Sequence, residues 1–134
     1  MPDDLRRRVE TARVARLATV DTTGRPHVVP ICFALVGETV YSAVDRKPKR
    51  SPRLKRLDNI RANPGVEVLV DHYEDDWSSL WWVRLRGRAF VVDDGEELRR
   101  ALEALAAKYP QYRVDPPPGP VLAVALDRWK WWHG

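Results

Sequence analysis

Hydrophobic and polar residues alternate along much of the chain with the two-residue period of a strand that buries one face. Six stretches show this pattern and are predicted to be strands: residues 14–19, 27–35, 39–44, 66–73, 80–92 and 121–132. Gly87 falls inside the fifth stretch, where a glycine indicates a bulge or a close approach of another backbone. Mostly short turns separate the stretches, so neighbouring strands are expected to run antiparallel.

Three further stretches space their apolar residues as helices do. The first follows Asp3-Asp4, either of which is expected to cap it. The second begins at Ser51, a favourable cap residue, and ends before residues 63–65. The third begins at Asp94 and is expected to end at Tyr109-Pro110.

These elements predict a mainly β fold with α (α+β). Because short turns join antiparallel neighbours and closure removes exposed sheet edges, we expect a six-stranded antiparallel β-barrel with about three peripheral helices. Side chains would fill the interior of so small a barrel, so a ligand would bind in an outer groove or at a subunit contact. The 134 residues suit a single domain, 1–134.

Composition supports a globular protein, with 44% hydrophobic and 31% charged residues. No apolar run reaches the roughly 18 residues of a membrane span, and the acidic start differs from a basic secretory signal. We therefore expect a cytoplasmic protein. The single cysteine, Cys32, lies in an apolar run and is expected to be a buried, inert thiol.

The most concentrated charge lies between the third strand and the second helix. Seven cations follow Asp45 within eleven residues: Arg46, Lys47, Lys49, Arg50, Arg53, Lys55 and Arg56. Such a cluster repels itself unless an anion is present, and a helix start adds free amide donors. The pattern therefore predicts a phosphate site, with surplus cations for a ligand of several negative charges; the alternative is a solvated basic loop without a ligand.

Six tryptophans form the second signal: Trp77, Trp81, Trp82, Trp129, Trp131 and Trp132. Trp77 follows an acidic turn and is expected to be at least partly exposed, where its ring can lie along a planar ligand. Among Trp81, Trp82 and Trp129, alternate members are expected to fill the core while the others cover a dimer surface.

The common catalytic and nucleotide-binding motifs are missing. The sequence has no Gly-x-Ser-x-Gly, Walker or Gly-x-Gly-x-x-Gly pattern, and His27, His72 and His133 lack metal-ligand spacing. Any chemistry would come with a cofactor, which fits a redox role.

Four segments, taken in order, point to a family: ARLATV at 15–20, GRPHVVP at 24–30, NIRANP at 59–64 and RGRA at 86–89. Together they resemble the flavin and deazaflavin split-barrel oxidoreductases of the pyridoxamine 5'-phosphate oxidase-like superfamily, especially its actinobacterial F420-dependent branch. The resemblance implies a split β-barrel homodimer with two coenzyme sites at the subunit interface.

The resemblance also implies site residues. The coenzyme ring would lie along the second strand, the phosphate would bind Lys55 and Arg56, and Trp77 matches a tryptophan close to the coenzyme. The cofactor-binding residues expected from the cation cluster and the resemblance are His27, Pro30, Ile31, Asp45, Lys49, Arg50, Ser51, Arg53, Lys55, Arg56, Asn59 and Trp77.

The leading hypothesis is an oxidoreductase that uses coenzyme F420, whose oligoglutamate tail would occupy the surplus cations, to reduce a small conjugated acceptor. The first alternative is an FMN-dependent enzyme of the same fold. A second, from another class, is a single-strand nucleic-acid binder that uses the basic loop and the tryptophans; a haem-binding relative ranks below it. We expect a small-molecule substrate and a homodimer, without nucleic-acid or membrane partners.

Overall fold

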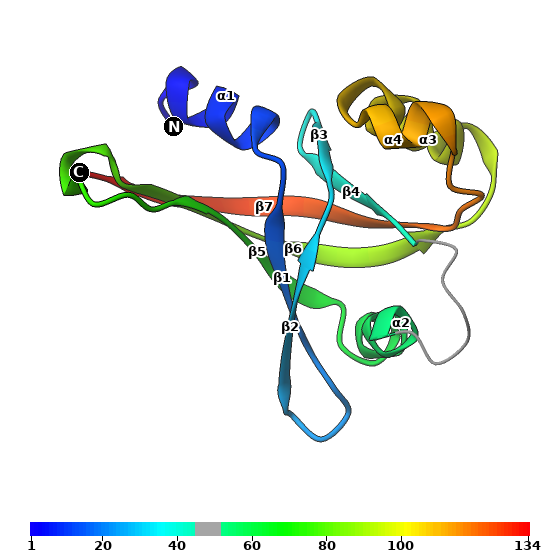
Figure 1. The fold of residues 1–134 in the computed structure, drawn as a ribbon. Coiled ribbons are helices and arrows are strands. Elements are labelled where there is room, and N and C mark those ends of the chain that lie inside the picture. Colours follow the sequence, from blue (N-terminus) through cyan, green and yellow to red (C-terminus); the bar gives the residue numbers. More distant parts are fainter. Residues whose placement is uncertain (45–51) are drawn as a thin grey trace.

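The computed structural model describes the backbone of residues 1–44 and 52–134, and the side chains of these residues except 52–54. Within them the chain forms one antiparallel sheet of seven strands with four α-helices (Figure 1). The strands are β1 (Ala15–Val20), β2 (Pro26–Ile31), β3 (Ala34–Val36), β4 (Thr39–Ala43), β5 (Gly65–His72), β6 (Trp81–Val92) and β7 (Val121–His133). The helices are α1 (Asp3–Thr11), α2 (Pro52–Ala62), α3 (Gly95–Lys108) and α4 (Pro110–Val114), with a 3-10 turn, η1 (Trp77–Ser79).

The sheet is curled into a half-barrel. Its strand order is β2-β1-β5-β6-β7-β4-β3, so β2 and β3 are the two edge strands. Only Cys32 and Phe33 separate these edges along the chain. Because a three-step extended segment spans about 10 Å, the sheet must curve until its edges approach each other.

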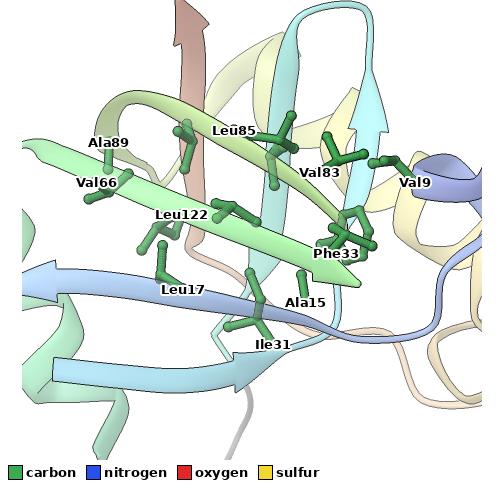
Figure 2. Packing of buried hydrophobic residues seen from close by; sticks show 14 of the residues in the cluster. Val9, Ala15, Leu17, Ile31, Phe33, Val66, Val83, Leu85, Ala89 and Leu122 are labelled. Atoms are coloured by element: carbon green, nitrogen blue, oxygen red, sulfur yellow. The ribbon is translucent and has the colours of Figure 1, made fainter. Parts of the chain in front are cut away.

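The curved sheet encloses the main hydrophobic core (Figure 2). Alternate residues of neighbouring strands point into it, and Leu17, Val68, Leu85 and Val124 are fully or almost fully buried. A second cluster lies where α3 covers β4 and β7, and it includes the buried Leu105. Burial of one face of each strand is what the two-residue period predicted.

The α+β class and the antiparallel sheet are confirmed, but the prediction of six strands is wrong. The stretch 27–35 is divided into β2 and β3 at Cys32 and Phe33. There the Phe33 amide donates a hydrogen bond to the Tyr109 hydroxyl at 3.0 Å, and that hydroxyl donates to the Arg13 carbonyl at 2.9 Å. The Tyr109 side chain thus provides a hydrogen bond to the backbone of the bend, which is not paired with a neighbouring strand.

The predicted end of the third helix is confirmed, because α3 ends at Lys108, before Pro110. Pro110 then begins the short helix α4, which was not predicted, at a position where a proline's missing N–H leaves no hydrogen bond unmade. The capping prediction for the first helix is wrong. Asp3 and Asp4 lie inside the first turn of α1, and neither caps the helix. Their negative charges interact favourably with the positive end of the helix dipole. The cap expected at Ser51 lies outside the described residues.

The prediction for Gly87 is confirmed. The pairing of β6 with β7 shifts register between Arg86 and Gly87, as a bulge does. A Cβ atom at Gly87 would lie 2.3 Å from the Ala125 carbonyl oxygen, so the two backbones approach closely only because this residue is glycine.

The prediction that Cys32 is buried is wrong, because the thiol is exposed. Cys32 sits in the bend between β2 and β3, outside the alternation that points strand residues inward. None of the described helices is long and apolar enough to cross a membrane.

Candidate functional site

A pocket of about 250 Å³ opens beside the edge strand β2. It is lined by Val14, Pro30, Ile31, Cys32, Ser42, Ala43, Arg56 and Tyr112. These residues come from the end of β2 and the bend after it, from β4, α2 and α4, and from the connection before β1 (Figure 1). Three residues predicted from the sequence, Pro30, Ile31 and Arg56, are therefore brought together at one site.

Arg56 gives this pocket its charge. Its residue is only 8% exposed, and it lies on the inner side of α2 beside Leu57, which packs in the core. A guanidinium keeps its charge at any physiological pH, and its planar N–H groups match two oxygens of a phosphate or carboxylate. The pocket wall thus carries a permanent positive charge that suits an anionic group.

Asn59 holds α2, the helix that carries Arg56, against the sheet. Its side-chain amide donates a hydrogen bond to the Thr19 hydroxyl at 3.0 Å, and both residues are buried. One helical turn separates Asn59 from Arg56, so anchoring Asn59 to β1 keeps the same helix face toward the sheet. Asn59 was predicted to contact the cofactor; it does not line the pocket.

His27 lies opposite Thr19 in the pairing of β1 with β2, close to the Asn59 anchor. Its Nδ1 atom is buried and has no hydrogen-bond partner among the described residues. A buried ring nitrogen of this kind is costly to leave unsatisfied. His27 therefore offers a hydrogen bond to a ligand or a water molecule, although it does not line the pocket.

Lys55 points elsewhere. Its Nζ lies 3.6 Å from Asp21 Oδ2 in the β1–β2 turn. Hydrogen bonds from the Thr23 hydroxyl and from the Arg25 and Thr23 amides hold the pKa of Asp21 far below its ordinary value, so this carboxylate is charged at neutral pH. In the structure Lys55 is paired with that turn and not with the pocket.

Trp77 is far from the pocket. It is 68% exposed in η1, in the loop that Figure 1 shows beside the C-terminus, at the other end of the long strands from α2. Its indole donates a long hydrogen bond of 3.4 Å to the Tyr73 hydroxyl. One chain alone therefore does not bring Trp77 and Arg56 to a common ligand. Asp45, Lys49, Arg50, Ser51 and the side chain of Arg53 lie outside the described residues.

Sequence reasoning missed five lining residues: Val14, Cys32, Ser42, Ala43 and Tyr112. Ser42 had a signal, because it is a small polar residue inside a predicted strand. Tyr112 had none, since it lies on α4, which the pattern did not predict.

Solved structures share the fold over almost the whole chain. A conserved hypothetical protein from Mycobacterium tuberculosis matches with a TM-score of 0.78 and 20% identity, covering 99% of this chain and 84% of its own. A FAD-binding protein from Mesorhizobium loti matches with a TM-score of 0.73 and 22% identity, covering 98% and 93%. HutZ, a heme storage protein from Vibrio cholerae, matches with a TM-score of 0.73 and 17% identity, covering 98% and 92%.

At these identities the similarity shows the fold, whose examples include FAD-binding and heme-storing proteins. No curated protein matches the sequence. The family model described as pyridoxamine 5'-phosphate oxidase matches residues 1–133, nearly the full length. The chain therefore belongs to the pyridoxamine 5'-phosphate oxidase family.

Proposed function

We propose that this protein is an oxidoreductase that binds coenzyme F420 in the Arg56 pocket and transfers hydride between it and a small conjugated acceptor. The observation that carries the proposal is the largely buried Arg56 guanidinium in the wall of a pocket next to the edge strand β2. Family membership supports a flavin-type coenzyme.

The residues of the pocket fit such a coenzyme. Arg56 would bind its phosphate, and the Ser42 hydroxyl adds a small hydrogen-bonding group beside it. Because β2 is an edge strand, some of its backbone N–H and C=O groups have no strand partner and suit the polar rim of a flavin-type ring. Val14, Ile31 and Ala43 give an apolar wall that excludes water. The coenzyme, when bound, supplies the hydride chemistry.

The active form is proposed to be a homodimer. Trp77 in η1 and Arg56 in α2 lie at opposite ends of the long strands (Figure 1), so both contact a single coenzyme only if Trp77 comes from a second copy. This arrangement would also cover the part of the ring that extends from the pocket.

F420 is preferred to FMN because of the cations in the sequence from Arg46 to Arg53, which exceed what one phosphate requires. FMN is the second candidate, favoured by the fold shared with a FAD-binding protein.

Titration of the full-length apo-protein with F420 and with FMN, followed by tryptophan fluorescence, tests both candidates. We expect Arg56→Gln to weaken coenzyme binding about 10- to 100-fold, the loss of one charge-assisted hydrogen-bonded contact. Arg61→Gln, at an exposed arginine on the same helix, is the matched control and should bind normally. Reversing Lys49 and Arg50 to glutamate should weaken F420 far more than FMN.

Micromolar binding of FMN with none of F420 would overturn the choice of coenzyme. Binding of neither, by a folded protein, would overturn the function.

A further inference from the structure

The bend between β2 and β3 places an exposed thiol near a buried amine. Cys32 is exposed and directly precedes Phe33, and the Nζ atom of Lys108 lies 3.7 Å from the centre of the Phe33 ring. Burial, first of all, and the charge of Arg13 lower the pKa of Lys108, while the charge of Cys32 raises it. The thiol and the amine are therefore close enough to interact electrostatically.

The backbone around Lys108 is held in place, while its amine has no partner. The Arg13 guanidinium donates a hydrogen bond to the Lys108 carbonyl at 3.1 Å, and the Tyr109 hydroxyl donates to the Arg13 carbonyl at 2.9 Å. The Nζ atom of Lys108 is buried and has no hydrogen-bond partner among the described residues. Because a buried, unpaired ammonium is costly, these surroundings increase the fraction of neutral amine, which is the nucleophilic form.

Cys32 has no second cysteine with which to form a disulfide among the 134 residues. A peroxide oxidises an exposed thiol to a sulfenic acid, which condenses with a thiol or with a nitrogen nucleophile. Without a second thiol in the chain, a nearby nitrogen is the partner that remains. Lys108 supplies such a nitrogen, because its amine reaches the bend from the end of α3.

We propose that Cys32 and Lys108 form a peroxide-sensitive cross-linking site, in which oxidation of the thiol is followed by an S–N bond to the amine. Hydrogen peroxide transfers one oxygen to the Cys32 sulfur as its O–O bond breaks, which gives a sulfenic acid and water and oxidises the sulfur by two electrons. The lone pair of the Lys108 nitrogen then attacks this sulfur. The S–O bond breaks, the nitrogen loses a proton, and a second water leaves.

The product is a sulfenamide, and it is reversible. Two molecules of a small thiol reduce it to the free thiol and amine and leave as their own disulfide. The sulfenamide nitrogen carries no charge, so the cross-link also removes the buried, unpaired ammonium of Lys108. Its formation is therefore favoured by the same burial that makes the charged amine costly.

The cross-link has a consequence for the Arg56 pocket, because Cys32 lines that pocket. Only this consequence rests on the proposed function. A bound coenzyme covers the thiol, so the loaded protein should cross-link more slowly than the apo-protein. The cross-linking site itself stands whether or not a coenzyme binds.

Mass spectrometry of the full-length apo-protein tests the proposal. After treatment with hydrogen peroxide, the intact mass should fall by two hydrogens relative to the reduced protein. Proteolysis should then yield a pair of peptides joined between Cys32 and Lys108. Dithiothreitol should restore the reduced mass and separate the two peptides.

Two matched variants separate the amine from the other lysines. Lys108→Arg keeps a cation but removes the amine, so the loss of two hydrogens should disappear and dimedone should trap the sulfenic acid at Cys32. Lys130→Arg is the control, because Lys130 is exposed on β7, outside the bend and the pocket, and it should cross-link as the unaltered protein does. Lys108→Met provides a second variant without the amine if Lys108→Arg does not fold in urea denaturation.

The proposal is overturned if peroxide carries Cys32 to the sulfinic acid without a cross-link, or if either Lys108 variant still loses two hydrogens. A loaded protein that cross-links as fast as the apo-protein would instead overturn the placement of the coenzyme against Cys32. Failure of this proposal is thereby distinguishable from failure of the proposed function.

Discussion

The ammonium nitrogen of Lys108 lies 3.7 Å from the centre of the Phe33 ring, buried and without a hydrogen-bond partner among the described residues. Burial, and secondarily the nearby charge of Arg13, lower the pKa of Lys108 to about 8. Attraction to the ring offsets only part of this cost. The contact places a partly desolvated amine beside the bend that divides β2 from β3.

This pKa predicts a pH-dependent stability. The folded protein releases the Lys108 proton near pH 8 and the unfolded chain near 10.5, so the unfolded chain holds more protons in between and stability rises with pH through that window. Lys108→Met should therefore raise the free energy of unfolding at pH 7, and the gain should shrink by about pH 9.5. Urea denaturation at both pH values checks this. An equal gain at both pH values for Lys108→Met would contradict the assignment.

The Tyr109 hydroxyl should stabilise the bend between β2 and β3. Tyr109→Phe removes the acceptor of the Phe33 amide and the donor to the Arg13 carbonyl. Leaving these groups unsatisfied should lower the free energy of unfolding by about 1–3 kcal/mol in urea denaturation. Tyr73→Phe, at a 66% exposed tyrosine, should change it by no more than about 0.5 kcal/mol. Equal effects of the two variants would rule out this role for the Tyr109 hydroxyl.

Gly87→Ala should destabilise the protein. The new methyl group would lie 2.3 Å from the Ala125 carbonyl oxygen, so the β6–β7 pairing must shift, at a cost of about 1–3 kcal/mol or more. Gly65→Ala is the control, because nothing lies within 4 Å of its added atom. Thermal and urea unfolding of both variants check the contrast, and a neutral Gly87→Ala would show that the close approach relaxes freely.

Lys55 and Arg56 are adjacent in sequence but should differ in coenzyme binding. Lys55 is paired with Asp21, while Arg56 lines the pocket. Lys55→Gln should therefore change the affinity less than about threefold, whereas Arg56→Gln should lower it about 10- to 100-fold. Fluorescence titration of both variants checks this. A larger effect at Lys55 would mean that its side chain leaves Asp21 when the ligand binds.

Cys32 should react with a thiol reagent in the folded protein, because it is exposed and lines the pocket. Bound coenzyme should slow this reaction by covering the thiol. The rate of labelling with an aromatic disulfide, with and without coenzyme, measures the protection. A Cys32 that reacts only in urea, or equally fast when loaded, would place the ligand elsewhere.

The sequence predicted the strands wherever burial of one face sets the pattern, and it predicted the close approach at Gly87. It missed the break between β2 and β3 because the group that binds the Phe33 amide comes from Tyr109, 76 residues further along the chain. Apolar spacing around the bend continues without interruption, so local reasoning has no sign of it.

The candidate site was predictable in part. Pro30 and Ile31 of β2 line one pocket with Arg56 of α2, and their contact with a coenzyme stays a prediction. The pairing of Lys55 with Asp21 depends on how the β1–β2 turn packs beside α2, which no local pattern shows. The position of Trp82 directly opposite Trp132 required the register of β6 with β7.

The two sides of β7 have unlike surroundings. Trp129 packs against the core and its indole donates to Glu38, while Lys130 and Trp132 point to the opposite side. A single residue inserted or deleted in the middle of this strand would turn the side chains beyond it to the opposite face of the sheet. Core side chains such as Trp129 would then point outward, or outer ones such as Lys130 inward. We therefore expect β7 to tolerate substitutions on its outer side but not changes of length.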